Sequence, residues 1–140
     1  MSTFLSLSKI TEEKINVLFD KNGAFFAFSK SQFEEAKKPG IEYTSLPSGL
    51  ICPKENVEAL LKEFDQIHTQ GIKEQVERFG AERIIQDEYF NHEIQISGEN
   101  QELVDFFESY RELYPEQFSE EVILAVCKKC FQKAIDNDWF

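Results

Sequence analysis

VEALLKEFDQIH, at residues 57–68, is the stretch that decides the fold of this chain. Its apolar side chains recur every three or four residues, the spacing that places them on one face of a helix. They are Val57, Leu60, Leu61, Phe64 and Ile67, followed by His68. Glu58 and Asp65 lie on the opposite face. The stretch predicts a long amphipathic helix, interrupted at Gly71 and resumed as far as Gly80.

The residues before this helix predict a small mixed element. Short apolar runs bounded by Pro and Gly indicate strands, and a Ser or Thr followed by acids indicates the start of a helix. In chain order we expect a helix from Thr11, a buried strand at 24–28, a helix at 31–38 opened by a Ser31–Glu34 capping box, and a hairpin of strands at 41–46 and 49–52.

The residues after it predict mainly helices. We expect a helix from Ile84 to His92, an edge strand at 94–97, a helix from Asn100 to Tyr114, and a final helix opened by Ser119. The fold class is therefore α+β, mostly helical, with a small N-terminal β element followed by four or five amphipathic helices. At 140 residues we expect a single domain, 1–140, with a near-neutral α/β part at 1–52 and a helical part at 53–140.

The charge of the chain is unevenly distributed. Residues 55–121 contain 18 acidic and five basic side chains, a balance of −13, whereas residues 1–54 and 122–140 each have a balance of +1. The total is the net charge of −11. Direct binding to nucleic acid requires clustered Lys and Arg, so we expect none. The acidic middle instead predicts a partner with a basic surface.

Composition indicates where the protein works. No apolar run approaches the roughly 18 residues of a membrane span, so we expect no membrane association. The start, MSTFLSLSKITEEK, has no basic segment ahead of a long apolar stretch and does not resemble a signal peptide. Three Cys, an odd number, indicate free thiols in a reducing compartment. We therefore expect a cytoplasmic protein.

The acidic helices supply the candidate partner-binding residues. Six acids fall largely opposite the apolar faces of their helices: Glu58, Asp65, Glu102, Asp105, Glu108 and Glu112. Arg111 is the only base near the last four, and like charges four residues apart cost roughly a few tenths of a kcal/mol. An ordinary solvated face is the simplest explanation. The alternative is a face that mimics a track of phosphates and occupies a groove lined by Lys and Arg.

Residues 87–93, DEYFNHE, look most like part of a chemical site. On a helix Glu88 and His92 share a face, and with Glu93 they could begin a carboxylate–imidazole metal site. No second His follows, so the HExxH motif is absent. A small metal-dependent enzyme is therefore an alternative function, and the simpler expectation is that His92 bonds a neighbouring carboxylate or backbone group.

Cys127 and Cys130 form a single CxxC in the middle of the last expected helix. Both fall on its apolar stripe, and a structural zinc site needs four ligands, usually including a second such pair. We expect core thiols, with no metal and no cofactor. A structural or regulatory homo-oligomer joined through the face from Cys127 to Phe131 is a further alternative.

Two segments carry a resemblance to a known group of proteins: SGLICPKENV at 48–57 and DEYFNHE at 87–93. Together they resemble small uncharacterised proteins carried on bacterial mobile elements and phages. The resemblance implies an accessory or anti-defence protein in the cytoplasm of a bacterial host cell. Anti-CRISPR inhibitors, often small and acidic, belong to this class, and several bind the guide or target channel of an effector nuclease.

These observations predict a non-enzymatic interaction protein without catalytic residues. Its acids would bind a basic protein surface on a nucleic-acid-handling effector, such as a CRISPR nuclease or its ribonucleoprotein, and would act as an inhibitor. Tyr110 and Trp139 are candidate aromatic anchors for that contact.

Overall fold

The computed structural model describes residues 3–140, and the chain divides into two compact units, Met1–Lys73 and Glu74–Phe140. We call them the N-terminal unit and the C-terminal unit. The dividing point lies within one helix, α3 (Val57–Phe79). The expected change from a near-neutral part to a helical part, between residues 52 and 53, therefore falls inside the N-terminal unit.

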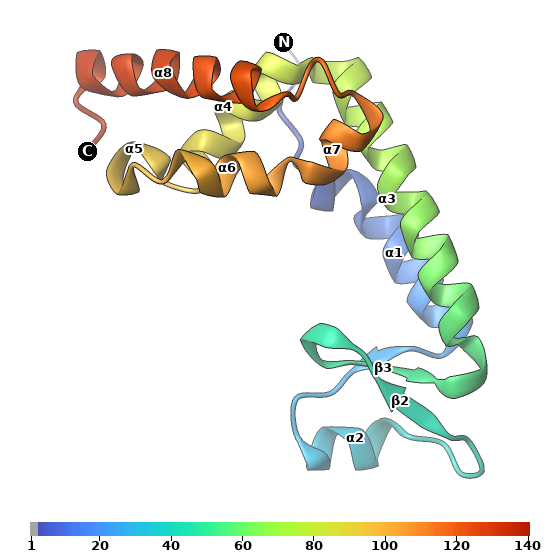
Figure 1. Cartoon of the computed structure of the whole chain (residues 1–140). Coiled ribbons are helices and arrows are strands. Elements are labelled where there is room, and N and C mark those ends of the chain that lie inside the picture. Colours follow the sequence, from blue (N-terminus) through green and yellow to red (C-terminus); the bar gives the residue numbers. More distant parts are fainter. Residues whose placement is uncertain (1–2) are drawn as a thin grey trace. The chain divides into compact units, whose positions relative to one another are not determined.

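The N-terminal unit combines helices with a small antiparallel sheet (Figure 1). Its elements are α1 (Leu7–Asn22), β1 (Phe25–Phe26), α2 (Lys30–Ala36), β2 (Tyr43–Ser45), β3 (Leu50–Pro53) and the first part of α3, with 3-10 turns at Pro47–Gly49 and Lys54–Asn56. The strand order is β1-β3-β2, and Thr44 lies opposite Cys52. The predicted hairpin is therefore confirmed, with Pro47–Gly49 as its turn.

A small apolar core joins the sheet to the helices of this unit. Leu18 of α1, Cys52 of β3 and Leu60 of α3 are buried together with Ala24. Asn22 closes the end of α1, where its side-chain amide donates to the carbonyl of Leu18. The amphipathic helix predicted at 57–68 is confirmed only in part: Leu60 is buried in this core and Val57 and Ile67 pack against it, but Leu61 and Phe64 are 51% and 37% exposed.

The beginning of α1 and the course of α3 differ from the prediction. Ser6, not Thr11, caps α1, and Thr11 is buried in the helix with its hydroxyl donating to the carbonyl of Leu7. Gly71 does not interrupt α3. A Cβ at Gly71 would lie 2.5 Å from Cγ2 of Thr11 and 3.0 Å from Cδ1 of Leu7. Gly71 therefore lets α1 and α3 approach closely.

Two further predictions for the N-terminal unit are wrong in detail. Ser29, rather than Ser31, caps α2 by accepting a hydrogen bond from the backbone N–H of Gln32. The strand expected at 24–28 is only two residues long, and Phe26 and Phe28 are 51% and 74% exposed. The run of aromatic residues suggested a strand buried on both faces. Instead, the rings of Phe26 and Phe28 stack on each other at the surface.

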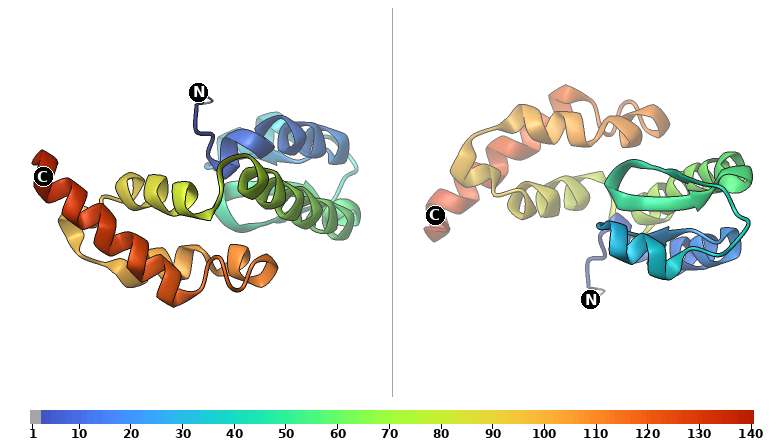
Figure 2. Two further views of the ribbon diagram at one scale, coloured as in Figure 1. Left: turned by 90° about the horizontal axis from the view of Figure 1, so that it is seen from above. Right: turned by 90° about the horizontal axis from the view of Figure 1, so that it is seen from below.

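The C-terminal unit contains the end of α3 and five further helices. They are α4 (Ala81–Asn91), α5 (Ile94–Ser97), α6 (Asn100–Phe106), α7 (Glu108–Leu113) and α8 (Glu120–Asn137). α8 packs against α4, α5 and α6, and it runs alongside α6 in Figures 1 and 2. Ser119 caps α8 as predicted, accepting from the N–H of Val122.

Two predictions for this unit are wrong. Residues 94–97 form one helical turn instead of an edge strand, because the backbone turns at Glu93 (φ 53°) and Gly98 (φ 74°). The alternating sequence that suggested a strand corresponds to alternating burial in the helical turn, because Ile94 is buried and Ile96 is exposed. The helix expected from Asn100 to Tyr114 is divided at Phe107 into α6 and α7.

The α+β, mostly helical fold class is confirmed, with the small sheet near the N-terminus. What differs is the segmentation of the helices, which depends on close contacts and on local backbone turns.

Replacing Gly71 with Ala should destabilise the protein, even though Ala favours a helix by up to ~1 kcal/mol over Gly. The added methyl would overlap Thr11, and overpacking typically costs about 1–3 kcal/mol. Urea denaturation followed by circular dichroism would measure the change. Thr11→Ser in the Gly71→Ala background removes the opposing methyl and should restore much of the stability. A Gly71→Ala variant as stable as the parent would contradict the contact.

Candidate functional site

The two units differ sharply in charge. Residues 1–73 contain nine basic and ten acidic side chains, a balance of −1. Residues 74–140 contain six basic and 16 acidic side chains, a balance of −10. Nearly all of the net charge therefore belongs to the C-terminal unit, which makes this unit the place to look for a surface that binds a basic partner.

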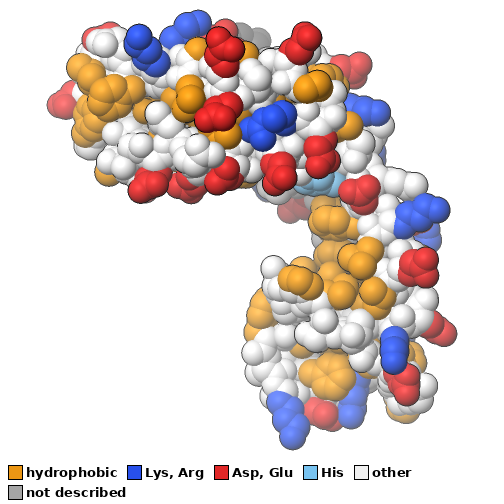
Figure 3. Space-filling view, viewed as in Figure 1, with side chains coloured by type: hydrophobic (Ala, Val, Ile, Leu, Met, Phe, Trp, Pro, Cys, Tyr) orange, Lys and Arg blue, Asp and Glu red, His pale blue; other side chains and the backbone are white. Residues whose placement is uncertain are grey.

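Four of the predicted acids form an edge of the C-terminal unit along α6 and α7. This acidic edge consists of Glu102, Asp105, Glu108 and Glu112, all of them exposed. The buried residues Leu103, Phe107 and Tyr110 hold the other side of the same two helices in the core. Figure 3 shows acidic side chains gathered along this part of the unit. The amphipathic pattern thus orients the carboxylates toward solvent.

The single base within this segment does not neutralise the acidic edge. Arg111 donates from Nε to the carbonyl of Phe118 (3.0 Å) and from Nη2 to the carbonyl of Val104 (2.7 Å). Val104 lies in the last turn of α6, where helical carbonyls have no N–H partner within the helix. None of the ion pairs among residues 3–140 involves Arg111, Glu108 or Glu112.

The six predicted acids differ in their surroundings. Asp105 accepts a hydrogen bond from the amide of Gln101 at 3.0 Å, and Glu102 contacts His92. Glu58 and Asp65 are also exposed, but they lie in the part of α3 that belongs to the N-terminal unit. The acidic edge is therefore one local surface, and Glu58 and Asp65 are outside it.

His92 lies between two carboxylates of the C-terminal unit. Its Nε2 is 3.2 Å from Oε2 of Glu88, and its Nδ1 is 3.2 Å from Oε1 of Glu102. Glu88 is buried, and the ring of Phe106 packs edge-on against the imidazole with centroids 4.8 Å apart. Both contacts can be hydrogen bonds to ionised carboxylates only when both ring nitrogens carry a proton. The cluster links the end of α4 to the start of α6.

This geometry suits a structural link better than a metal site. The two nitrogens of an imidazole point in divergent directions, so Glu88 and Glu102 cannot converge on one ion with His92 between them. Glu93 stands at a left-handed backbone position and is exposed. Among residues 3–140, no group of three or more His, Cys, Asp or Glu side chains is placed to hold a metal ion.

Sequence reasoning missed the partner of His92. Glu102 is ten residues away, on a different helix, and no periodicity relates the two positions. It also missed Gln75, which is fully buried and accepts a hydrogen bond from the hydroxyl of Tyr110. Tyr110 itself is buried, so it cannot serve as the exposed aromatic anchor that we expected. Trp139 is 44% exposed.

The cysteines of the CxxC are core residues, as predicted. Cys127 and Cys130 are buried and free, and burial raises the pKa of each thiol to about 11. Burial also raises the pKa of the Cys52 thiol. A thiol that stays protonated at neutral pH is a poor nucleophile and a poor metal ligand. These residues therefore contribute packing to the two units.

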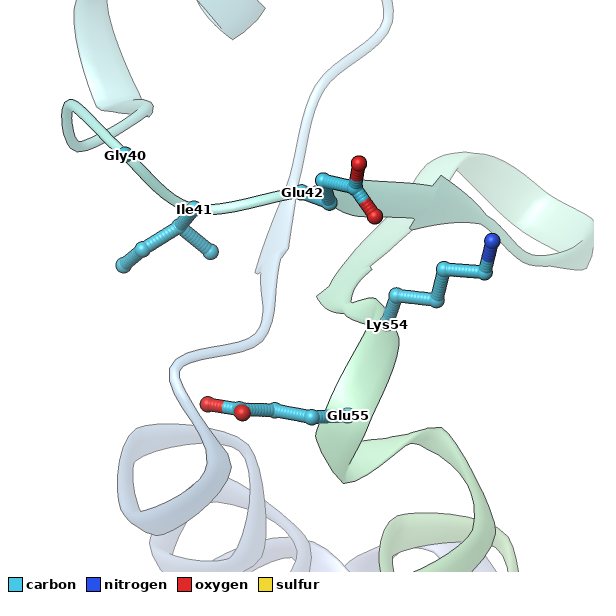
Figure 4. A pocket seen from close by; sticks show the side chains of 5 residues that line it. All are labelled: Gly40, Ile41, Glu42, Lys54 and Glu55. Atoms are coloured by element: carbon cyan, nitrogen blue, oxygen red, sulfur yellow. The ribbon is translucent and has the colours of Figure 1, made fainter.

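A hollow of about 420 Å³ lies beside the hairpin of the N-terminal unit. Its lining residues are Gly40, Ile41, Glu42, Lys54 and Glu55 (Figure 4). The figure shows the carboxylates of Glu42 and Glu55 pointing in different directions, with the ammonium of Lys54 apart from both. Because these charged groups do not converge on one point, we do not assign a binding or catalytic role to this hollow.

Comparison with known proteins identifies the family. A profile described as "Family of unknown function (DUF7659)" matches residues 7–133, so the chain belongs to this family. No curated protein and no solved structure matches the chain significantly. Within residues 3–140, no helix is both long enough and apolar enough to cross a membrane.

Arg111→Lys should lower the free energy of unfolding by about 2 kcal/mol, because a lysine keeps the charge but cannot reproduce the two-point guanidinium contact. Arg111→Met should lower it by at least as much. Chemical denaturation of both variants measures the effect. If Arg111→Lys were as stable as the parent, charge alone would account for the role of Arg111, and the hydrogen bonds to the two carbonyls would not matter.

High pH should destabilise the protein partly through Cys127 and Cys130. Their thiol pKa is about 11 when folded against 9.0 for an ordinary thiol, so unfolding favours ionisation as the pH rises. The stabilising contribution is complete below pH 9 and is lost as the pH approaches 11. Urea denaturation across this range should show a smaller decline in the Cys127→Ala/Cys130→Ala variant than in the parent. Identical declines would exclude the thiols as the cause.

Proposed function

We propose that this protein is a non-enzymatic interaction protein whose acidic edge binds the basic surface of a nucleic-acid-handling protein. One observation carries the proposal. Four exposed carboxylates follow one another along α6 and α7 in a unit of net charge −10, while the only base among them, Arg111, is bonded to backbone carbonyls. The edge therefore presents negative charge outward.

The physical basis is that Glu108 and Glu112 have no ion-pair partner among the described residues, so their charge can be neutralised by another protein. Glu108 and Glu112 are one turn apart on α7, and like charges at this spacing repel each other in the free protein. A surface rich in Lys and Arg would remove that repulsion. It would also attract the acidic edge from a distance and so accelerate association.

The nucleic-acid groove of an effector is the kind of basic surface that fits best. Such grooves hold rows of Lys and Arg that contact successive phosphates. A row of carboxylates held on two packed helices can occupy the same positions and exclude the nucleic acid. In this role the protein would be an inhibitor, and the expected anti-defence function, including anti-CRISPR inhibition, is one form of it. Glu58, Asp65 and Trp139 are candidates for additional contacts.

The cluster around His92 supports a non-enzymatic function. Each ring nitrogen of His92 faces a carboxylate of the same unit, so neither is left to take a proton from a substrate. Glu88 is buried and contacts the imidazole of His92, and the ring of Phe106 packs against the same imidazole. These contacts join α4 to α6. We accordingly assign partner binding to the acidic edge and no catalysis to Glu88, His92 or Glu93.

Charge reversal at the acidic edge tests the proposal. The variant Glu108→Lys/Glu112→Lys should lose a basic nucleic-acid-binding partner that the parent captures from nuclease-treated bacterial lysate at low salt. The capture should also be lost at high salt, because exposed charges are then screened. Mass spectrometry identifies the retained proteins, and added nucleic acid should compete with them.

A matched control makes the result specific. Glu74→Lys/Glu77→Lys changes the net charge of the same unit by the same amount, at exposed positions on α3 outside the acidic edge. This control should retain the partner. If the edge variant captured the same proteins as the parent, with circular dichroism unchanged, the acidic edge would not be the binding surface.

A further inference from the structure

A second hollow, of about 340 Å³, opens on the C-terminal unit, and none of the acidic-edge or His92-cluster residues is part of its lining. Leu124, Lys128 and Phe131 of α8 line one side at spacings of four and three residues, which places them on one helix face. Tyr89 of α4 and Ile94 of α5 line it from neighbouring helices. Its volume lies within the range of about 300–1,000 Å³ that is typical of small-molecule sites.

Apart from Lys128, the walls of this hollow are apolar or neutral. Leu124 and Phe131 are only partly covered, at 38% and 46% exposure, so apolar surface is open to a ligand. Burial holds the pKa of the Cys127 thiol at about 11 and that of Tyr89 at about 12, so neither lining residue is charged at neutral pH. Lys128 is the only charged residue of the lining.

The side chain of Lys128 also differs from the other basic side chains of its unit in its interactions. Its neighbour Lys129 pairs with Glu82 at 3.2 Å, and the ammonium of Lys133 lies over the ring of Trp139 at 5.7 Å. The arginines of the unit likewise contact a carboxylate, a ring or backbone carbonyls. Among the described residues 74–140, Lys128 alone of the basic side chains has no ion pair, hydrogen bond or ring contact. In a unit with 16 acids, this exception lies at an apolar hollow.

We propose that the hollow binds a small amphipathic anion, an alkyl chain with a carboxylate head. The chain would cover Leu124 and Phe131 and fill the space above Cys127, and the head would pair with the ammonium of Lys128. Salt at physiological ionic strength screens exposed charges over about 8 Å, which weakens the repulsion between the acids of the unit and a bound anion. This site is independent of the acidic edge and of the function proposed for it.

Three ligands with the same chain and different heads test the site: decanoate, decanol and decyltrimethylammonium, each below its micelle-forming concentration. The fluorescence of Trp139, the only Trp, is a suitable reporter, because the adjacent Phe140 packs against Phe131. Decanoate should bind saturably and more tightly than decanol, and the cation should bind most weakly. Absence of saturable binding by decanoate, or tighter binding of the cation, would overturn the proposal.

Substitutions locate the contact. Lys128→Gln should weaken decanoate about fivefold, the upper range for one exposed ion pair, and leave decanol unchanged. Lys129→Gln, one residue further along the same helix, is the matched control and should leave decanoate binding unchanged. Leu124→Glu places a carboxylate at the rim of the hollow, so it should weaken decanoate and strengthen the cation. Equal effects of the two lysine substitutions would show that general surface charge, and not this site, governs binding.

Vesicles of phosphatidylglycerol separate a free anion from a lipid surface. A hollow that takes a single alkyl chain should bind free decanoate and should not retain the protein on vesicles. Retention on vesicles that is lost with Lys128→Gln, without binding of free decanoate, would assign the site to a membrane lipid and overturn the proposal as stated.

Discussion

The guanidinium of Arg111 is the contact on which the shape of the C-terminal unit depends. It joins the last turn of α6, through Val104, to the segment after α7, through Phe118. The helix break at Phe107 and the return of the chain toward α8 are thereby tied to each other. Phe107 and Phe118 are both fully buried and pack with their ring centroids 5.3 Å apart. Without the guanidinium, carbonyl groups beside this aromatic core would lose their hydrogen-bond donors.

This use of Arg111 has an electrostatic consequence. A base that could have formed an ion pair with Glu108 or Glu112 is instead directed into the structure, so the neighbouring carboxylates remain outward and unpaired. Arg83 and Lys129 behave differently, because each of them pairs with a carboxylate, Asp87 and Glu82 respectively. The result is a unit with a buried aromatic interior and an acidic edge on which Glu108 and Glu112 have no ion-pair partner among the described residues. Lys128 stands apart from this pattern because its neighbours in the hollow are apolar.

The N-terminal unit illustrates a different constraint, the distance between two helices. Gly71 lies where Thr11 and Leu7 of α1 approach α3, and a glycine there is required by space rather than by a turn. A glycine inside a helical period usually suggests an interruption, since glycine weakens helices. Here a glycine is needed because α1 lies too close to α3 to leave room for a side chain at residue 71. This close packing adds to the small apolar core around Leu18, Cys52 and Leu60.

The sequence alone determined the features that depend on local spacing. The apolar period of 57–68, the Ser119 cap, the hairpin turn at Pro47–Gly49, the buried position of the CxxC and the concentration of acid could all be predicted, because each follows from residues a few positions apart. Tertiary structure decided the rest: the continuity of α3 at Gly71, the break at Phe107, the helical turn at 94–97 and the pairing of His92 with Glu102. Each of these depends on groups distant in the chain or on a backbone turn that no periodicity records. The exposure of the acidic edge needed both, since the sequence supplies the carboxylates and the fold removes Arg111 from them.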